Sequence, residues 1–389
     1  MNLLSKLPNV GTTIFTTMSQ MALDHNAINL GQGFPDFNPD SKLLDLVNKA
    51  MREGHNQYPA MAGVPALREA IQKKVASLYG HTYRADTEIT VTSGATEALS
   101  ASLLALVHPG DEVIIIEPFY DLYLPVIELA GGKPVIVSML APDSNNPRFR
   151  VDWQAVNDAI TSKTKLLIVN FPHNPTGIVM TAADLDSLEE IVNKTGILVL
   201  GDEVYEHLVF DGAKHLSLAT RPSLAANSVV IFSFGKTYNV TGWKIGYVCA
   251  PEKITAEIRK VHQFLVFTVP SPLQVGLATF MQDESTYSGL SDFYEQKRDL
   301  LSKGLNTTAL KPLPSEGTFF LLADYSQMSD LPQLKFSTWL TKEKGVTVIP
   351  VSAFYQDPQR FDSTHRIVRF CFAKQDATLL QAVERLRKA

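Results

Sequence analysis

Four short apolar segments of this chain are each followed by residues that could do chemistry. These residues are Gly94, Ala95 and Thr96 after Ile89–Thr92; Asn174 after Leu166–Asn170; Asp202 and Tyr205 after Ile197–Gly201; and Lys236 after Val229–Ser233. In an open α/β sheet, ligands bind beyond the carboxyl ends of the strands, so these residues are expected to face one ligand. The set offers an amine, a carboxylate and a strand-to-helix turn whose N–H groups can bind an anion.

The elements that would position these residues follow an α/β pattern between about residues 40 and 280. The other expected strands are Glu112–Ile116, Pro134–Val137 and Ile245–Cys249, and the expected helices are Val64–Tyr79, Ala95–Val107, Ala182–Asn193 and a long one from about Ile254. Several strands are apolar on both faces, which indicates a parallel sheet with helices on both sides. We therefore predict an α/β fold with a large doubly wound domain and a mostly parallel sheet.

The C-terminal part has a different order of elements. A helix at Asp292–Leu310 is followed by a strand at Thr318–Leu322, a helix near Leu334–Lys344, strands at Thr347–Ile349 and Arg366–Phe372, and a helix at Ala377–Arg387. This order predicts a smaller α+β domain. The first forty residues have weak periodicity and turn-forming residues. The predicted division is an N-terminal arm and loop that packs with the small domain (1–40), a large domain (41–285) and a small C-terminal domain (286–389).

Composition and charge exclude several classes of protein. The chain of 389 residues has a net charge of −5 and a sequence pI of about 6.0, which gives no electrostatic footprint for nucleic acid or an anionic membrane. No apolar run approaches the length that crosses a bilayer, and the N-terminus is a poor secretory signal. The two cysteines, Cys249 and Cys371, lie in apolar strand-like segments and indicate buried thiols in a reducing compartment. We expect a cytoplasmic protein that binds neither nucleic acid nor a membrane.

Three common motifs do not fit. The segment GQGFPD at 31–36 starts like a dinucleotide-binding turn, but it lacks the third Gly and contains a Pro. The tripeptide GKT at 235–237 ends like a nucleotide phosphate loop, but Val230 stands where that loop needs a Gly. The nine His residues show no metal-ligand spacing, so no metal site is expected.

Six longer motifs occur in order along nearly the whole chain: SGATEAL, EPFYDLY, NFPHNPTG, GDEVYEHL, SFGKTYNVTGWKIGY and VRFCFA. Together they resemble fold-type I pyridoxal-5′-phosphate (PLP) enzymes and, within these, the class I/II aminotransferases. The resemblance is strongest to the branch that contains kynurenine/glutamine-type and bacterial methionine aminotransferases. It implies PLP as the cofactor, and amino acids and 2-oxo acids as the small-molecule partners.

The resemblance assigns the two residues on which PLP chemistry depends most. Lys236 is similar to the lysine that holds the cofactor as a Schiff base and moves a proton between substrate and cofactor. Asp202 resembles the carboxylate that pairs with the pyridine nitrogen and keeps the ring cationic. A surface lysine on a turn and a helix-capping aspartate are the alternative interpretations.

The same motifs imply further contacts to the cofactor ring. Asn174 and Tyr205 would hydrogen-bond its phenolic oxygen, although an Asn before a Pro is also an ordinary turn former and Tyr205 an ordinary core aromatic. Phe119 would stack on the ring, and Tyr120 is the neighbouring alternative. The sequence leaves the isomer of the Asn174–Pro175 bond open.

The phosphate group would be bound by several small contacts. The residues implied are Gly94, Ala95, Thr96, Ser233, Lys244 and, from the neighbouring subunit, Tyr58. Lys244 stands where many relatives have an arginine. A lysine offers a point charge in place of the bidentate hydrogen bonds of a guanidinium. A Tyr58 shared between subunits implies a homodimer; otherwise it is a loop aromatic packed on its own chain.

The substrate contacts implied by the resemblance point to a neutral amino acid. Arg369 would bind the α-carboxylate through two parallel bonds, helped by Asn174 and the backbone N–H of Gly33. Dicarboxylate-specific relatives add a second arginine, but Phe264–Pro272, the segment expected to reach across the dimer, contains no cation. The residues expected to line the apolar side-chain pocket are Phe15, Phe34 and Phe267.

We therefore expect methionine, aromatic amino acids, leucine, and glutamine or kynurenine as amino donors and a 2-oxo acid as the acceptor, in a two-stage, ping-pong sequence. Two other functions fit the same residues. A cysteine-conjugate β-lyase would share Lys236, Asp202 and Arg369, because a fold does not fix a reaction. A PLP-binding regulator without turnover usually adds a DNA-binding module, and the segment before Gly31 is short and not basic.

Overall fold

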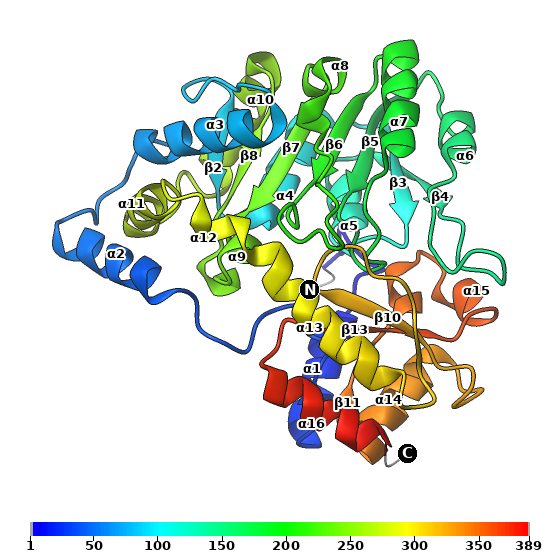
Figure 1. Ribbon diagram of the computed structural model, residues 1–389. Helices are drawn as coiled ribbons and strands as arrows, with labels where there is room; N and C mark the ends of the chain where they lie inside the picture. Colours follow the sequence, from blue (N-terminus) through cyan, green and yellow to red (C-terminus); the bar gives the residue numbers. More distant parts are fainter. Residues whose placement is uncertain (1–2, 388–389) are drawn as a thin grey trace.

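The computed structural model describes residues 3–387. Its largest feature is a seven-stranded sheet made of β2 (Ile89–Thr92), β3 (Glu112–Glu117), β4 (Lys133–Ser138), β5 (Thr164–Asn170), β6 (Leu198–Asp202), β7 (Ser228–Ser233) and β8 (Gly246–Cys249). The order across the sheet is β2-β8-β7-β6-β5-β3-β4, and β8 alone runs antiparallel to its neighbours (Figure 1). The carboxyl ends of the other six strands therefore share one edge.

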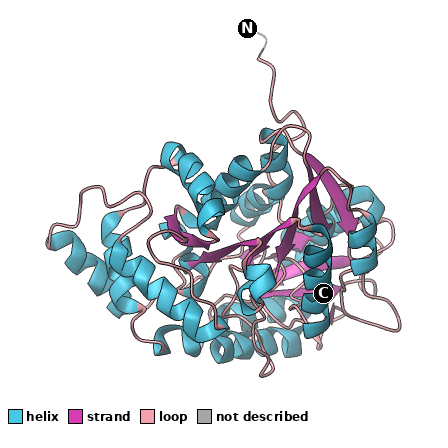
Figure 2. Ribbon diagram, turned by 90° about the horizontal axis from the view of Figure 1, so that it is seen from above, coloured by secondary structure: helices cyan, strands magenta, loops and turns pink. Residues whose placement is uncertain are grey.

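Apolar side chains alternate along the strands and explain why helices cover both faces of this sheet. In β3, Val113 and Ile115 pack in one core cluster, whereas Ile114 and Ile116 pack in the other. The helices on the first face are α4 (Gly94–Leu106), α5 (Tyr123–Leu129) and α10 (Glu252–Leu265), and those on the second include α3 (Pro65–Tyr79), α7 (Ala182–Thr195) and α8 (Pro222–Ala225) (Figure 2). A sheet covered on both faces leaves the carboxyl edge of its strands open to a ligand.

A second, antiparallel sheet lies in the C-terminal part, below the large sheet in Figure 1. Its order is β12 (Ile349–Pro350), β13 (Ile367–Cys371), β10 (Phe320–Asp324) and β9 (Lys311–Pro312), and the helices of this part are α13 (Leu290–Leu305), α14 (Gln333–Lys344), α15 (Pro358–Asp362) and α16 (Asp376–Arg387). Its core contains aromatic side chains such as Phe336, Phe370 and Phe372.

The N-terminal segment packs on this C-terminal part. β1 (Ile28–Asn29) pairs in parallel with β11 (Val346–Thr347), and Met18 of α1 (Ile14–Asp24) packs against Ile349 and Phe354. The domain boundaries near residues 40 and 285 remain predictions.

The structure corrects three sequence-based expectations. The N-terminal arm contains a regular helix, α1, that its weak periodicity did not indicate. The long helix from Ile254 is two helices, α10 and α11 (Ser271–Phe280), because Pro270 cannot continue the hydrogen-bond ladder of the first. The strand expected at 347–349 is divided between β11 and β12, which belong to different sheets.

The other helices are short or lie at the edges of the two sheets. They are α2 (Ser41–Arg52), α6 (Trp153–Asp158), α9 (Phe234–Thr237), α12 (Ser285–Ser288) and three 3₁₀ turns, Leu218–Thr220, Thr241–Trp243 and Val351–Phe354. No helix within residues 3–387 is both long and apolar enough to span a bilayer.

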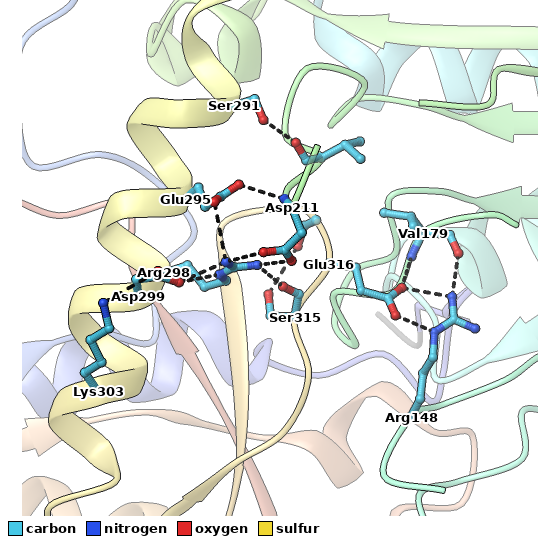
Figure 3. A network of polar contacts seen from close by, with 12 residues as sticks. Arg148, Val179, Asp211, Ser291, Glu295, Arg298, Asp299, Lys303, Ser315 and Glu316 are labelled. Atoms are coloured by element: carbon cyan, nitrogen blue, oxygen red, sulfur yellow. Dashed lines mark hydrogen bonds and ion pairs between the residues drawn. The ribbon is translucent and has the colours of Figure 1, made fainter. Parts of the chain in front are cut away.

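Ion pairs fix the C-terminal part against loops of the large sheet (Figure 3). Arg148 binds Glu316 through two bonds of 2.6 and 2.9 Å and also donates to the carbonyl of Val179. Arg298 on α13 binds Asp211 through a second pair of bonds, of 2.6 and 2.9 Å. Two bidentate arginine–carboxylate pairs hold a defined relative orientation, since planar guanidinium groups fix direction as well as distance.

A buried ion pair stabilises the segment that follows β6. The ammonium of Lys74, on α3, binds the carboxylate of Glu206, and both side chains are almost fully buried. The hydroxyl of Tyr79 donates to Glu206 at 2.5 Å, and Lys74 donates to the hydroxyl of Tyr247 at 3.0 Å. Burial alone would raise the pKa of Glu206, but Lys74 and the hydrogen bonds outweigh it and lower the pKa to about 2.

This pair predicts a specific pattern of stability changes. Lys74→Met leaves a buried carboxylate without its cation and is expected to cost about 3–5 kcal/mol of unfolding free energy. The double variant Lys74→Met/Glu206→Gln removes both charges and is expected to recover most of that loss. Denaturant unfolding followed by circular dichroism measures both.

An exposed ion pair provides the control. Lys42 and Asp283 lie 3.7 Å apart with most of the lysine side chain in solvent, so Lys42→Met is expected to change stability by no more than about 1 kcal/mol. A Lys74→Met variant as stable as Lys42→Met would contradict the assignment.

Candidate active site

A cavity of about 370 Å³ lies where the carboxyl ends of the large sheet face the C-terminal sheet. Its volume is in the range of small-molecule and cofactor sites. The expected site residues that line it are Phe15, Gly33, Gly94, Ala95, Thr96, Asn174, Asp202, Tyr205, Ser233, Lys236, Lys244 and Arg369. The fold thus brings together residues that lie more than 300 positions apart in the sequence.

Lys236 projects into the cavity from α9, the short helix that follows β7. Its Nζ donates to the carbonyl oxygen of Gly33 at 3.2 Å and lies 5.0 Å from the ring centre of Phe319. Burial, together with the positive charges of Arg369 and Lys244, lowers the pKa of Lys236 to about 8. More of the amine is therefore neutral, and nucleophilic, near neutral pH than in an exposed lysine.

Asp202, the last residue of β6, has one carboxylate oxygen bonded and one without a partner. The hydroxyl of Tyr123 donates to Oδ2 at 2.6 Å, whereas Oδ1 is buried and accepts no hydrogen bond. Burial raises the pKa of Asp202 to about 6 although the bond from Tyr123 opposes that change. A buried carboxylate oxygen is costly without a donor, so a cationic N–H group of a ligand fits this position.

The start of α4 forms an anion-binding turn beside these groups. Gly94 has a φ of +71°, a conformation that favours glycine, and it lets the chain turn directly from β2 into the helix. Free N–H groups and the helix dipole at this end attract an anion. The ammonium of Lys244 donates to the hydroxyl of Thr96 at 2.8 Å. Gly246 permits the close packing below, because a Cβ there would lie 2.6 Å from the carbonyl oxygen of Phe232.

Arg369 lies on β13 and forms the opposite wall of the cavity. Its Nη1 donates to Oδ1 of Asn174 at 2.6 Å, and its Nη2 donates to the carbonyl oxygen of Gly31 at 3.0 Å. The ring of Phe320 stacks on the guanidinium at 3.8 Å. Burial lowers the pKa of Arg369 to about 10, so it keeps its charge at neutral pH. Its Nε is buried without a partner, which suits a carboxylate of a ligand.

Tyr205 and Asn174 complete the wall between Lys236 and Arg369. Tyr205 packs edge-on against Phe319 at 5.1 Å, and burial raises its pKa well above the usual value, so its hydroxyl stays protonated. The Asn174–Pro175 bond, left open by the sequence, is cis.

Phe119 does not line the cavity, and Tyr120 does. The backbone N–H of Phe119 donates to the carbonyl of Phe354, and its side chain packs in the core between the sheet and α5. Tyr120 lies on the cavity wall near Thr96. Tyr120 therefore lies on the cavity wall and Phe119 behind it, and the expected contact of Phe119 with a ring stays a prediction.

Three other expected residues also lie outside this cavity. Phe34 is 46% exposed, and the ammonium of Lys374 lies 4.8 Å from its ring centre. Tyr58 and Phe267 pack edge-on against each other at 5.4 Å, and Tyr58 is 85% exposed. Tyr58 and Phe267 thus form an apolar surface on the outside of the chain.

Sequence reasoning missed residues that shape the site. Tyr123 belongs to the quoted motif EPFYDLY, but only the structure shows its bond to Asp202. Phe320 is preceded by a second Phe, and the pleat of β10 decides which one stacks on Arg369. Asn170 also lines the cavity, as the last residue of an otherwise apolar strand. A polar residue at the carboxyl end of a buried strand is the signal that could have identified it.

Known proteins match this chain along its full length. Residues 25–386 match the family model for aminotransferase class I and II. Methionine aminotransferase from Escherichia coli is 50% identical over 99% of this chain and 97% of its own length. A crystal structure from the same organism, described as showing a methionine aminotransferase function, superposes with a TM-score of 0.96 at 48% identity and covers all of both chains.

More distant relatives are named for other substrates. A probable N-succinyldiaminopimelate aminotransferase from Mycobacterium tuberculosis is 41% identical over 98% of this chain and 97% of its own length. Human kynurenine–oxoglutarate transaminase 1 is 35% identical over 95% of this chain and 94% of its own length. With this coverage and with the arrangement of Lys236, Asp202 and Arg369 around one cavity, the chain belongs to the class I and II aminotransferases, a family of enzymes that use pyridoxal 5′-phosphate.

Proposed function

We propose that this aminotransferase moves the amino group of neutral amino acids, methionine and aromatic ones above all, to a 2-oxo acid. The observation that carries the proposal is the cavity in which Lys236, Asp202 and Arg369 face one another with apolar and aromatic side chains around them. The match to a methionine aminotransferase at 50% identity supports the same donor class.

The residues present fit the cofactor. Asp202 offers an unpaired carboxylate oxygen for the ring nitrogen, and the N-terminus of α4 with Lys244 offers a phosphate site. Tyr120, Tyr205 and Asn174 line the cavity, and in this proposal Tyr120 would contact the ring face while Tyr205 and Asn174 would donate to its phenolic oxygen. When bound, the cofactor supplies an aldehyde that condenses with amines and a ring that accepts electrons.

Lys236 has two tasks in this proposal. Its amine, with a pKa of about 8, is the group that attaches the cofactor. With a substrate amino acid bound, its Nζ would be the base that takes the proton from the substrate Cα. Asp202, held by Tyr123, keeps a negative charge against the ring nitrogen throughout.

Arg369 orients the substrate. Asn174 and Gly31 hold the guanidinium in place, and its unpaired Nε and the remaining N–H groups are available to the α-carboxylate. The rings of Phe15 and Phe320, which both line the cavity, lie 5.3 and 3.8 Å from the guanidinium carbon. A substrate side chain held beside them meets aromatic surface, which favours methionine and aromatic donors over charged ones.

Lys236→Ala tests the attachment of the cofactor. We expect the variant to lose the visible absorbance of the bound cofactor and at least about a hundredfold of its transaminase rate, because both the attached amine and the base are removed. Absorbance spectra and a coupled assay with methionine measure the two effects.

Lys133→Ala, at a side chain that is 70% exposed, serves as the control and should keep both properties. Product analysis separates the alternative function, because a β-lyase would release pyruvate and ammonia without a 2-oxo acid. Full activity in Lys236→Ala would refute the assignment of this lysine.

The donor preference predicts a difference between methionine and aspartate. The positive charges on the cavity wall are Lys236, Lys244 and Arg369, each already assigned to the cofactor or the α-carboxylate. A second carboxylate on the substrate would lack a partner, so aspartate should react at least about a hundredfold more slowly. Single-turnover spectra of the loaded enzyme with each donor measure the rates, and a faster reaction with aspartate would overturn the proposed pocket.

We further propose that the enzyme works as a homodimer in the cytoplasm. An apolar surface formed by Tyr58, Phe264 and Phe267 supports the dimer, since Phe264 is 85% exposed beside the Tyr58–Phe267 contact. In this arrangement Tyr58 and Phe267 reach the site of the partner subunit. Cys249 and Cys371 are buried free thiols, which supports a reducing compartment.

Phe264→Arg tests the dimer. A charge at the centre of this apolar surface should shift the protein toward a monomer and lower its activity about tenfold or more, because each site would lose its contacts from the partner. Sedimentation velocity measures the mass. Leu380→Arg, at a leucine on α16 that is 55% exposed, is the control and should leave a dimer. A Phe264→Arg protein that stays dimeric and active would exclude this surface as the interface.

A further inference from the structure

Asn170 connects two parts of the active site that lie on separate segments of the chain. It is the last residue of β5 and is paired in register with Asp202 at the end of β6. Its side chain is 7% exposed and lines the cavity. The proposed function gives this residue no task.

Both ends of the Asn170 amide are hydrogen-bonded to the backbone of site residues. Nδ2 donates to the carbonyl oxygen of Asp202 at 2.7 Å, and Oδ1 accepts from the backbone N–H of Asn174 at 2.9 Å. These partners determine the orientation of the amide. In a reversed amide, Oδ1 would face the carbonyl oxygen of Asp202 and Nδ2 would face the backbone N–H of Asn174, and neither pair could form a hydrogen bond. One side chain therefore sets the distance between two backbones.

The segment that carries Asn174 needs this support. It follows β5 as a turn rather than a strand, so sheet hydrogen bonds do not hold it. Without Asn170, the backbone N–H of Asn174 would be buried and unpaired, which is costly. The side chain of Asn174 in turn holds Nη1 of Arg369 at 2.6 Å.

We propose that Asn170 is a positioning residue that keeps Asp202 and Asn174 at the separation the cofactor ring requires. The inference rests on the proposed function, in which Asp202 meets the ring nitrogen and Asn174 meets the phenolic oxygen. These two atoms lie at different positions of one rigid ring, so a fixed spacing between their partners lowers the cost of binding it. Asn170 touches neither reacting atom and acts through the two residues that it joins.

Asn170→Leu tests the inference, because leucine has a similar volume and removes both hydrogen bonds. We expect the dissociation constant for pyridoxal 5′-phosphate, titrated into the apoenzyme by fluorescence, to rise about 10- to 100-fold. We also expect a shift in the pH midpoint of the bound cofactor's absorbance, since the groups around the ring move. Asn170→Ser, whose short hydroxyl reaches at most one of the two backbones, should weaken binding less and replaces the leucine variant if that does not fold.

A matched control separates positioning from general stability. Gln333 is another fully buried amide that joins two backbone segments, with Oε1 accepting from Ser352 at 2.8 Å and Nε2 donating to the carbonyl of His365 at 3.1 Å. Gln333→Leu should lower the melting temperature as Asn170→Leu does, but it should leave the cofactor affinity and the absorbance midpoint unchanged.

The possible outcomes are distinct. If Asn170→Leu binds the cofactor within about twofold of the wild-type affinity and keeps its absorbance midpoint, the residue is only structural and the proposal fails. The same holds for Asn170→Ser where it is the variant that folds. If the wild-type protein itself shows no cofactor absorbance that depends on Lys236, the proposed function fails first, before any Asn170 variant is compared.

Discussion

The structure depends on burying three ionisable groups around one cavity. Burial lowers the pKa of Lys236 to about 8, raises that of Asp202 to about 6 and lowers that of Arg369 to about 10. Each pKa shift arises because the charged group has lost its hydration and the neighbouring groups compensate for that loss only in part. Among the buried side-chain atoms without a hydrogen-bond partner in residues 3–387 are a carboxylate oxygen and a guanidinium nitrogen of these groups, Oδ1 of Asp202 and Nε of Arg369. A cationic ring and a substrate carboxylate are the ligand groups that would complete them.

The segment that begins at Asp202 holds such charges because its residues divide between two sides. Asp202, Val204 and Tyr205 line the cavity, while Glu203 and Glu206 bond to buried polar groups away from it. Glu203 binds His215 at 2.8 Å and also accepts from the backbone of Leu218, so both of its oxygens are used. The same short segment thus carries residues that line the cavity and the anchors that hold them in place, which is the arrangement a rigid site requires.

Much of this site could be predicted from the sequence, and the parts that could not share a cause. The strands could be predicted because both faces of the sheet are buried, which gives continuous apolar segments. Polar residues at or just after the ends of these strands indicated Lys236, Asp202 and Asn174 as site residues. Phe119 lies in the core and Tyr120 on the cavity wall, and this arrangement involves contacts such as the hydrogen bond from Phe119 to Phe354, more than 200 residues away. Such long-range contacts leave no local pattern. The break between α10 and α11, by contrast, has a local sequence signal in Pro270.

The site also requires its two parts to be held in one arrangement. Lys236 and Asp202 belong to the large sheet and Arg369 to the C-terminal sheet, and the bond between Arg369 and Asn174 joins the two across the cavity. A rotation of one part against the other would move Arg369 away from Lys236 and Asp202. The bidentate pairs of Arg148 with Glu316 and of Arg298 with Asp211 oppose such a rotation at a distance from the cavity. The arrangement of the cavity residues is therefore maintained partly by ion pairs that do not line the cavity.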